Sequence, residues 1–293
     1  MLTSLLFAGN SEQKNKTNIS MKKLTSLLIF AGLTISVSGQ DQSQDNNEQK
    51  LVINIDLFNV KDENRSAYEK GETGVWKQYH QEKMKDGQMF GWALYKVAFP
   101  VGSETDFNYL TVNFRNPNPV TNARNNESQW QAAHPTLDSD KISELAADLV
   151  KLRKAVGSMP LNPFDVSSQS SDVGKYAIFS RAKLKVSVKD FYKSFSTVSM
   201  PIVKHAMEEN FVKAHLAGYH SAEDTITVIR GFGIDSADKV LDFNQEEFAK
   251  MAAKAHKSLT PEELNKAVTA FRSTFEEQMN ILAVLVDSAF AEQ

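Results

Sequence analysis

The chain contains no cysteine among its 293 residues. That absence excludes disulfide bonds, thiolate zinc sites, a cysteine nucleophile and a lipoprotein anchor. The chain also has no excess of basic residues, because 33 lysines and arginines face 36 aspartates and glutamates, for a formal net charge of −3. A nucleic acid is therefore not expected as a partner, since its phosphate backbone is held by clustered positive charge.

The sequence also lacks the short motifs that mark well-known catalytic sites. No GxSxG, Walker loop, HExxH, GxGxxG or EF-hand pattern occurs, and no metal site is predicted. The composition, with 41% hydrophobic and 24% charged residues, is that of an ordinary globular protein that can form a sizeable core. The length suits two domains better than one.

The amino-terminal region has the layout of an export signal. From Met21, two lysines precede an apolar run at 24–37, and small residues follow it. This order predicts a secretory signal peptide, and the run is too short for a stable membrane span. We assign 1–39 to a leader region, with Met21 as the true start, and 40–50 to a flexible mature terminus. The mature protein is expected to be periplasmic or secreted, with no stable membrane span after cleavage.

The first half of the mature chain, 51–156, alternates between strand-like and helix-like segments. β-branched and apolar residues in near alternation predict strands, and apolar residues at helical spacing predict helices. The predicted strands are 51–60, 88–99 and 106–115. The predicted helices are 62–86, 128–133 and 139–156, and the end of the last is equally compatible with a fourth strand. Gly87 is predicted to end the first helix.

The segment 157–174 is rich in Ser, Pro, Asp and Gly, and we interpret it as a linker to a second half at 175–293. In that half the strands are predicted at 175–186, 211–219 and 224–232, and the helices at 189–210, 245–257 and 261–290. Thr260 and Glu263 form a capping-box pattern at the start of the last helix. The apolar stripe that follows predicts one long C-terminal helix.

The order strand–helix–strand–strand–helix thus occurs twice. One such unit is a ferredoxin-like βαββαβ arrangement, in which the helices cover one face of the sheet. We therefore predict an α+β fold made of two ferredoxin-like repeats, 51–156 and 175–293. Their two sheets are expected to pair within one chain as an α/β barrel.

Two stretches carry a family resemblance: VWKQYHQEKMKDGQMFGWALYKVAFP, which ends at Pro100, and DFNYLTVNF at 106–114. On these residues the chain resembles the dimeric α/β-barrel superfamily in a tandem-repeat form, as in exported, largely uncharacterised proteins of Bacteroidetes-type bacteria. That superfamily includes monooxygenases, haem-degrading enzymes, dye-decolorising peroxidases and non-catalytic ligand binders, so the resemblance implies a fold but no single reaction. QWQAAHP, at 129–135, also fits it.

Aromatic residues mark the candidate ligand site. Trp76, Tyr79 and His80 share one face of the predicted helix, and Trp92 and Tyr95 follow on opposite faces of the next strand. One interpretation is a pocket with His80 as an acid–base group or haem ligand. The other is an aromatic stripe that packs on the sheet. In the second half, Val203 and His215 take the places of His80 and Trp92, so the two halves are not expected to be equivalent.

The predicted function is that of an exported protein that binds a small molecule in an α/β-barrel cavity. One alternative is an oxidoreductase of the monooxygenase or haem-degradation type, and another is a non-catalytic structural or interaction module. No cofactor is predicted from the residues, with haem as the alternative. The sequence names neither the ligand nor a reaction nor the oligomeric state.

Overall fold

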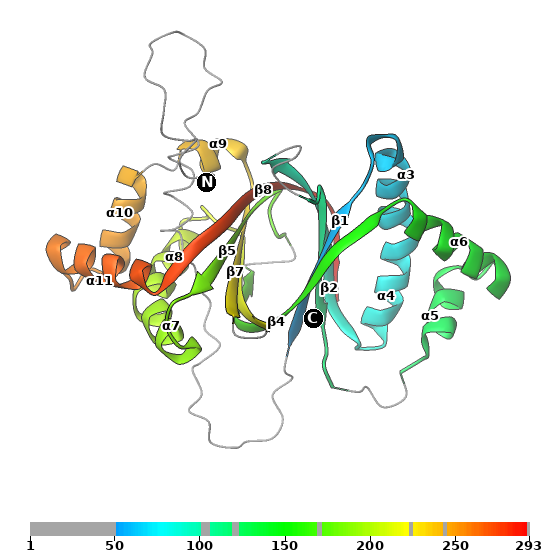
Figure 1. Ribbon diagram of the computed structural model, residues 1–293, viewed down its shortest axis with the longest axis horizontal. Helices are drawn as coiled ribbons and strands as arrows, with labels where there is room; N and C mark the ends of the chain where they lie inside the picture. The colour runs from blue at the N-terminus through cyan, green and yellow to red at the C-terminus, as the bar shows by residue number, and fades with distance from the viewer. Residues whose placement is uncertain are drawn as a thin grey trace, which may run out of the picture. The chain divides into compact units, whose positions relative to one another are not determined.

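The computed structural model describes residues 51–100, 106–118, 123–168, 172–222, 225–242 and 245–291, so the predicted leader region 1–39 and the stretch 40–50 lie outside the described residues. The fold is α+β, as predicted, with helices packed beside antiparallel strands (Figure 1). The chain divides into two compact units. We call Phe164–Asn280 unit 1, and the described residues up to Pro163 together with those from Ile281 onward unit 2.

Unit 2 begins with strand β1 (Val52–Asn59), as predicted from the alternation of its residues. The predicted helix after it is four consecutive helical segments, η1 (Asp62–Asn64), α3 (Arg65–Lys70), η2 (Gly71–Trp76) and α4 (Lys77–Lys85). Strands β2 (Met89–Phe99) and β3 (Tyr109–Arg115) and helices α5 (Asn126–Ala133) and α6 (Ser139–Lys151) follow. The first part of β4 (Lys154–Ser168) and the later part of β8 (Phe275–Phe290) complete this unit.

The strands of unit 2 are hydrogen-bonded in the order β4-β1-β3-β2-β8. Along one row of this sheet Trp92 lies opposite Asn113, which lies opposite Asn54. The face that carries Trp92 is the one the helices cover, because Trp92 packs in one apolar cluster with Tyr68 of α3 and Met84 of α4. The layer between these helices and the sheet is where the candidate site of unit 2 lies.

Gly87 ends α4, as the sequence predicted. Its φ is 69°, a left-handed conformation that only glycine adopts without strain. Its N–H donates to the Met84 carbonyl, and the N–H of Gln88 donates to the Lys83 carbonyl. These bonds satisfy two carbonyls that the helix end leaves without a partner, and the turn leads directly into β2.

Unit 1 has a similar order of elements, with three helices after its strand pair where unit 2 has two. Strand β5 (Tyr176–Leu184) leads into α7 (Val188–Ser194), η4 (Phe195–Ser199) and α8 (Met200–Glu208), then strands β6 (Ala214–Ala222) and β7 (Thr225–Ile234). Helices α9 (Ala237–Asp242), α10 (Gln245–Ala255) and α11 (Pro261–Ser273) follow. With parts of β4 and β8, the strand order in this unit is β8-β5-β7-β6-β4.

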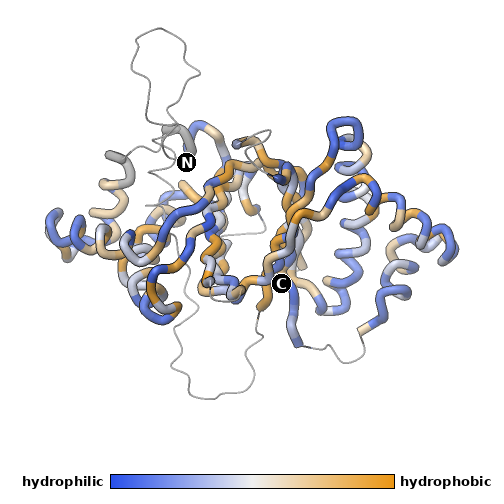
Figure 2. The backbone as a smooth tube through the Cα atoms, viewed as in Figure 1, coloured by the Kyte–Doolittle hydropathy of each residue, from blue (hydrophilic) through white to orange (hydrophobic). Residues whose placement is uncertain are grey.

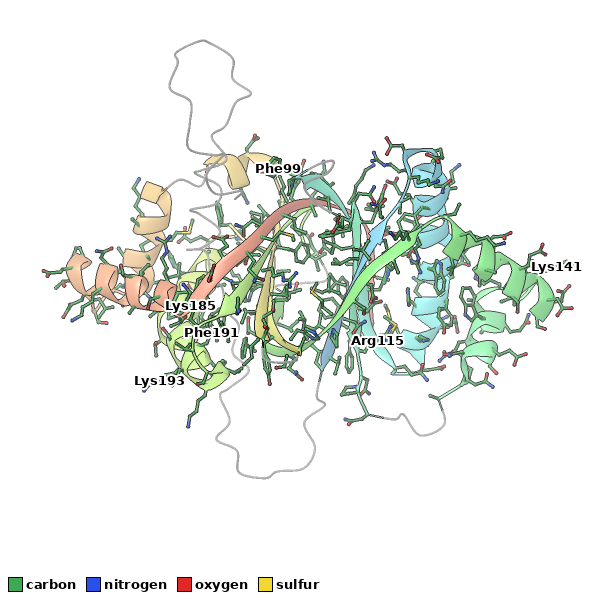
Figure 3. The ribbon with its side chains drawn as sticks, in the orientation of Figure 1. Phe99, Arg115, Lys141, Lys185, Phe191 and Lys193 are labelled. Atoms are coloured by element: carbon green, nitrogen blue, oxygen red, sulfur yellow. The ribbon has the colours of Figure 1, made fainter. Side chains whose placement is uncertain are left out.

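The helices of unit 1 also cover one face of their sheet. Phe191, Phe195 and Phe271 from the helices form an apolar cluster with Ala182, Ala217 and Val228 from the strands. The Phe191 side chain is 1% exposed, whereas Lys193 in the same helix points away from the protein (Figure 3). In Figure 2 the strands are mostly hydrophobic and the helices carry hydrophilic stretches, which is the pattern of a sheet covered by amphipathic helices.

Two segments differ from the sequence prediction. The long C-terminal helix expected at 261–290 was wrong, because the helix ends at Ser273 and Phe275–Phe290 forms strand β8. The apolar residues of this stretch fit a helical stripe, but β2 needs a partner along its edge, and β8 supplies it in register, with Phe290 opposite Gly91. The expected linker 157–174 instead contains most of β4, in which Leu161, Asp165 and Ser167 are buried.

Candidate functional site

All three tryptophans of the chain gather in unit 2. Together with Tyr79 and His80 they form what we call the aromatic cluster: Trp76, Tyr79, His80, Trp92 and Trp130. The His80 ring lies between two indoles, with centroid distances of 6.2 Å to Trp76 and 5.6 Å to Trp92. Trp130 stacks on Tyr79 at 4.3 Å and meets Trp76 edge-on at 5.0 Å.

Local structure explains how these side chains meet. Trp76 ends the π-helical segment η2, and Tyr79 and His80 follow at i+3 and i+4 in α4, so the three share one helix face. Gly71 lets helix α6 approach, because a Cβ there would lie 2.3 Å from a side-chain carbon of Leu149. π-Helical turns are rare and recur at functional sites.

Several polar atoms in and beside the aromatic cluster are buried without a hydrogen-bond partner. They are Nδ1 of His80, Nε1 of Trp92 and Nε2 of His134, whose ring lies 5.6 Å from that of Trp130. Burial lowers the pKa of His80 to about 3, with help from the positive charge of Lys83, so the imidazole is neutral at physiological pH. A neutral imidazole can accept a hydrogen bond, and the indole N–H can only donate one.

A buried ion pair lies beside the aromatic cluster. Glu72 of η2 is 3% exposed and pairs with Arg153, which follows α6. Burial raises the pKa of Glu72 to about 7, against the lowering effect of the Arg153 charge. The Arg153 guanidinium lies 5.5 Å from the Trp76 ring centroid and 4.1 Å from that of Phe58. A carboxyl with a pKa near neutrality can exchange a proton at physiological pH.

The strand surface below holds a polar network that is fully engaged. Asp56 accepts hydrogen bonds from Asn54 at 3.0 Å, from Asn113 at 2.9 Å and from Ser158 at 2.5 Å. Asn113 is 3% exposed, Asn54 and Asp56 are partly buried, and Ser158 is exposed, so the network runs from buried to exposed side chains. Because the carboxylate is satisfied within the sheet, we assign the network to the scaffold.

Four of the five predicted site residues therefore come together: Trp76, Tyr79, His80 and Trp92. Tyr95 does not join them, because it lies on the opposite face of β2 from Trp92, opposite Leu110 in register. The sequence analysis did not include Trp130 and His134 among the site residues. Their i, i+4 spacing, from the predicted helix 128–133 to the residue that follows it, was the available signal.

A pocket of about 300 Å³ lies elsewhere in unit 2, at the ends of β1, β2 and β3. Lys96, Arg65, Asn108 and Tyr109 are among its lining residues. Most of their polar groups are engaged within the protein: Lys96 and Tyr109 bond Glu69, and Asn108 bonds the backbone of Val60. Arg65 pairs with Asp62 through one Nη atom, and its buried Nε has no hydrogen-bond partner. The pocket offers space but few free groups to select a ligand.

Unit 1 holds a second set of buried polar groups, which the sequence analysis missed. His215 of β6 contacts Asp165 of β4, with 2.7 Å between Nδ1 and a carboxylate oxygen, and neither side chain is exposed. Arg230 of β7 is 2% exposed, and both of its Nη atoms are without a hydrogen-bond partner. Asp165 lies in the segment predicted to be a linker, and Arg230 lies in a predicted strand. No sequence motif marked either residue.

Within the described residues, no cluster of three or more His, Cys, Asp or Glu side chains could hold a metal ion. No helix in the same part of the chain is long and apolar enough to cross a membrane.

No family model matches the chain, and no curated protein matches it. Among solved structures it is similar to a candidate monooxygenase from Lactobacillus acidophilus, at 11% identity and a TM-score of 0.48 over 83% of this chain and 97% of that one. A candidate monooxygenase from Fusobacterium nucleatum gives 10% identity and 0.49 over 83% and 96%. A dye-decolorizing peroxidase from Bacteroides thetaiotaomicron gives 7% and 0.40 over 84% and 96%. At such low identity, and with TM-scores below 0.5, these neighbours assign neither a family nor a reaction to this chain.

Proposed function

We propose that the protein is an exported small-molecule-binding protein, and that its ligand is a flat, uncharged heteroaromatic molecule held at the aromatic cluster of unit 2. The observation that carries this proposal is the buried, unpartnered indole N–H of Trp92 beside the unpartnered Nδ1 of the neutral His80. A buried donor without an acceptor costs about 1–3 kcal/mol, which a ligand acceptor would recover.

The chemistry of the surrounding residues supports this ligand class. Trp76 and Trp130 are half-buried, so the aromatic cluster has an edge at the surface, whereas Trp92 is completely buried below it. Aromatic side chains bind flat molecules by stacking, and one well-placed polar group sets their orientation. The Trp92 N–H would take an acceptor nitrogen or oxygen of the ligand.

The export and the tandem-repeat architecture belong to the same proposal. The signal layout before residue 40 supports a periplasmic or secreted protein. The similar order of elements in the two units, including a π-helical segment after the first strand of each, supports two ferredoxin-like repeats. Strands β4 and β8, which belong to the sheets of both units, support pairing of the repeats as one α/β barrel. The proposed partner is the small-molecule ligand alone.

Haem is the cofactor that the resemblance to the superfamily suggests. His80 has the chemistry of an iron ligand but not the space that a haem needs. Its imidazole is neutral, the form that binds iron, and its Nδ1 is unpartnered. That nitrogen is nevertheless buried in a packed aromatic cluster, and His80 does not line the pocket of about 300 Å³. The aromatic cluster as it stands does not fit a haem.

The three tryptophans make a direct binding test possible, because the whole intrinsic indole fluorescence comes from the aromatic cluster. The mature protein is titrated with quinoline, a flat molecule with one acceptor nitrogen, and with naphthalene, which has the same shape and no acceptor. We expect a saturable fluorescence change with both, and about fivefold to tenfold tighter binding of quinoline, which corresponds to one hydrogen bond of about 1–1.4 kcal/mol.

The variant Trp92→Phe keeps the aromatic surface and removes the N–H, so it should bind both molecules equally. Tyr95→Phe, on the opposite face of the same strand, is the matched control and should keep the preference for quinoline. No saturable change with either molecule, or an unchanged preference in Trp92→Phe, would rule out the proposed site. A Soret band on addition of haem that is lost in His80→Ala would favour the haem alternative over it.

A further inference from the structure

The buried polar groups of unit 1 lie on one face of its sheet, beneath the helices. Arg230 of β7 lies opposite Ser180 of β5 on one side and opposite Ala217 of β6 on the other. His215 is two residues from Ala217 along β6, so its side chain is a diagonal neighbour of Arg230 on the same face. The His215 ring stacks with Phe195 of the helical layer at 6.4 Å, which places both groups between sheet and helices.

The Asp165 carboxylate fixes the tautomer of His215. Its oxygen lies 2.7 Å from Nδ1, so Nδ1 carries the proton and its N–H donates a hydrogen bond to the carboxylate. Burial lowers the pKa of His215, although the Asp165 charge opposes this effect. The imidazole is therefore neutral, and Nε2 has a free lone pair. That atom is buried and has no hydrogen-bond partner, so it is an unsatisfied hydrogen-bond acceptor.

Arg230 has unsatisfied hydrogen-bond donors, where His215 has an unsatisfied acceptor. Its side chain is buried, and Nη1 and Nη2 have no hydrogen-bond partner in the described part of the chain. The hydroxyl of Ser180, directly across the strand pair, is also buried without a partner. The guanidinium carbon lies 5.2 Å from the centroid of the Phe275 ring, a cation–π contact that gives none of the N–H groups a hydrogen-bond acceptor.

The acidic neighbour of Arg230 is Glu277, and it does not form an ion pair with it within 4.0 Å among the described residues. Burial raises the pKa of Glu277, and its side chain instead accepts a hydrogen bond from Asn280. A buried arginine without a counter-ion is costly, because desolvation of the charge is not offset. Two parallel free N–H groups fit a carboxylate, which binds guanidinium in a bidentate manner.

From these complementary groups we propose that unit 1 contains a binding site for a small hydroxycarboxylic acid. The ligand carboxylate pairs with the two Nη atoms of Arg230, and its hydroxyl donates to Nε2 of His215. Ser180 contributes a further hydrogen bond to the carboxylate. This site is separate from the aromatic cluster of unit 2 and takes a different class of ligand, so it adds a second binding activity to the proposed function.

Thermal unfolding of the whole mature protein tests this site, with glycolate and acetate as probes and sodium chloride at equal ionic strength as the reference. We expect both carboxylates to raise Tm in a saturable way, because each binds the folded state only. The apparent dissociation constant should be about tenfold lower for glycolate, whose hydroxyl adds one hydrogen bond to His215.

Three variants separate the contributions. Arg230→Met fills the same volume without charge, so it should fold with an unchanged or higher Tm and lose the response to both probes. Arg181→Met makes the same substitution at an exposed position of β5 and should keep both responses. His215→Gln retains a donor for Asp165 and lacks Nε2, so it should bind acetate as before and lose the glycolate advantage.

Two results would overturn the inference. One is a wild-type protein whose Tm responds no more to glycolate and acetate than to chloride. The other is an Arg230→Met variant that responds as the wild type does. A fall in the ligand-free Tm of Arg230→Met would also count against the site, because it would show that Arg230 already has a partner within the protein. Quinoline binding in unit 2 is measured independently, so either proposal can fail without the other.

Discussion

The two units carry different side chains in one row of the sheet face that their helices cover. In unit 2 the row that contains Trp92 continues with the amides of Asn113 and Asn54. In unit 1 the row that contains His215 continues with the apolar side chains of Phe232 and Ile178. A similar order of elements therefore supports amide side chains in the row beside Trp92 and apolar side chains in the row beside His215.

The largest difference between the units is whether a buried charged side chain has a partner within the protein. In unit 2 the buried carboxylate of Glu72 pairs with Arg153, and the partly buried Asp56 accepts three side-chain hydrogen bonds. In unit 1 the buried cation Arg230 has no such partner in the described residues. A paired charge stabilises the structure it is part of, whereas an unpaired one is retained at a cost in stability. On this difference we assign Arg153 to the scaffold and propose a ligand as the partner of Arg230.

The same substitution in the two units should have opposite effects, and this is the largest expected difference. Arg153→Met leaves Glu72 buried without its partner, so we expect the free energy of unfolding at pH 8 to fall by about 3–5 kcal/mol. Arg230→Met removes an unpaired charge and should leave that free energy unchanged or raise it. Urea denaturation followed by far-UV circular dichroism measures both. Equal losses in the two variants would abolish the distinction between the units.

A pH titration of stability would sharpen the account of unit 2. The pKa of Glu72 is raised from 4.5 to about 7, so between these values the folded state holds a proton that the unfolded state has released. The resulting stabilisation is complete below pH 4.5 and is lost as the pH rises through 7. The stability difference between wild type and Glu72→Gln should therefore decrease by about 3 kcal/mol over this window, at about 1.4 kcal/mol per pH unit.

His80 acts in the opposite direction and gives the internal control. Burial lowers its pKa from 6.5 to about 3, so its contribution is present above pH 6.5 and is lost as the pH falls toward 3. In the wild type the two groups oppose each other between pH 4.5 and 6.5. In Glu72→Gln only His80 remains of the two, so the stability of that variant should rise with pH across this range. A flat profile would show that His80 is not held neutral by burial.

Helical spacing predicted the meeting of Trp76, Tyr79 and His80, because the side chains of one helix face are fixed by local geometry. The buried groups of unit 1 could not be predicted in that way. Asp165 and His215 are 50 residues apart and meet only because β4 and β6 become neighbours. Strand β8 was mistaken for helix for a related reason: its apolar spacing fits both structures, and only the edge of β2 decides between them.

The smallest expected effect tests whether the two units unfold together. Thr260 caps α11 in unit 1: its hydroxyl accepts from the Glu263 N–H at 3.3 Å, and the Glu263 carboxylate accepts from the Thr260 N–H at 2.8 Å. Thr260→Ala should lower the free energy of unfolding by about 1 kcal/mol, and Ser258→Ala, an exposed position before the cap, should not.

The tryptophans make this small change informative, because their fluorescence reports on unit 2 alone, whereas circular dichroism reports on both units. Strands β4 and β8 belong to the sheets of both units, so we expect cooperative unfolding. The urea midpoint of Thr260→Ala should then shift equally by fluorescence and by circular dichroism. A shift seen by circular dichroism alone would mean that unit 1 unfolds by itself. In that case its proposed carboxylate site could open without disturbing the aromatic cluster.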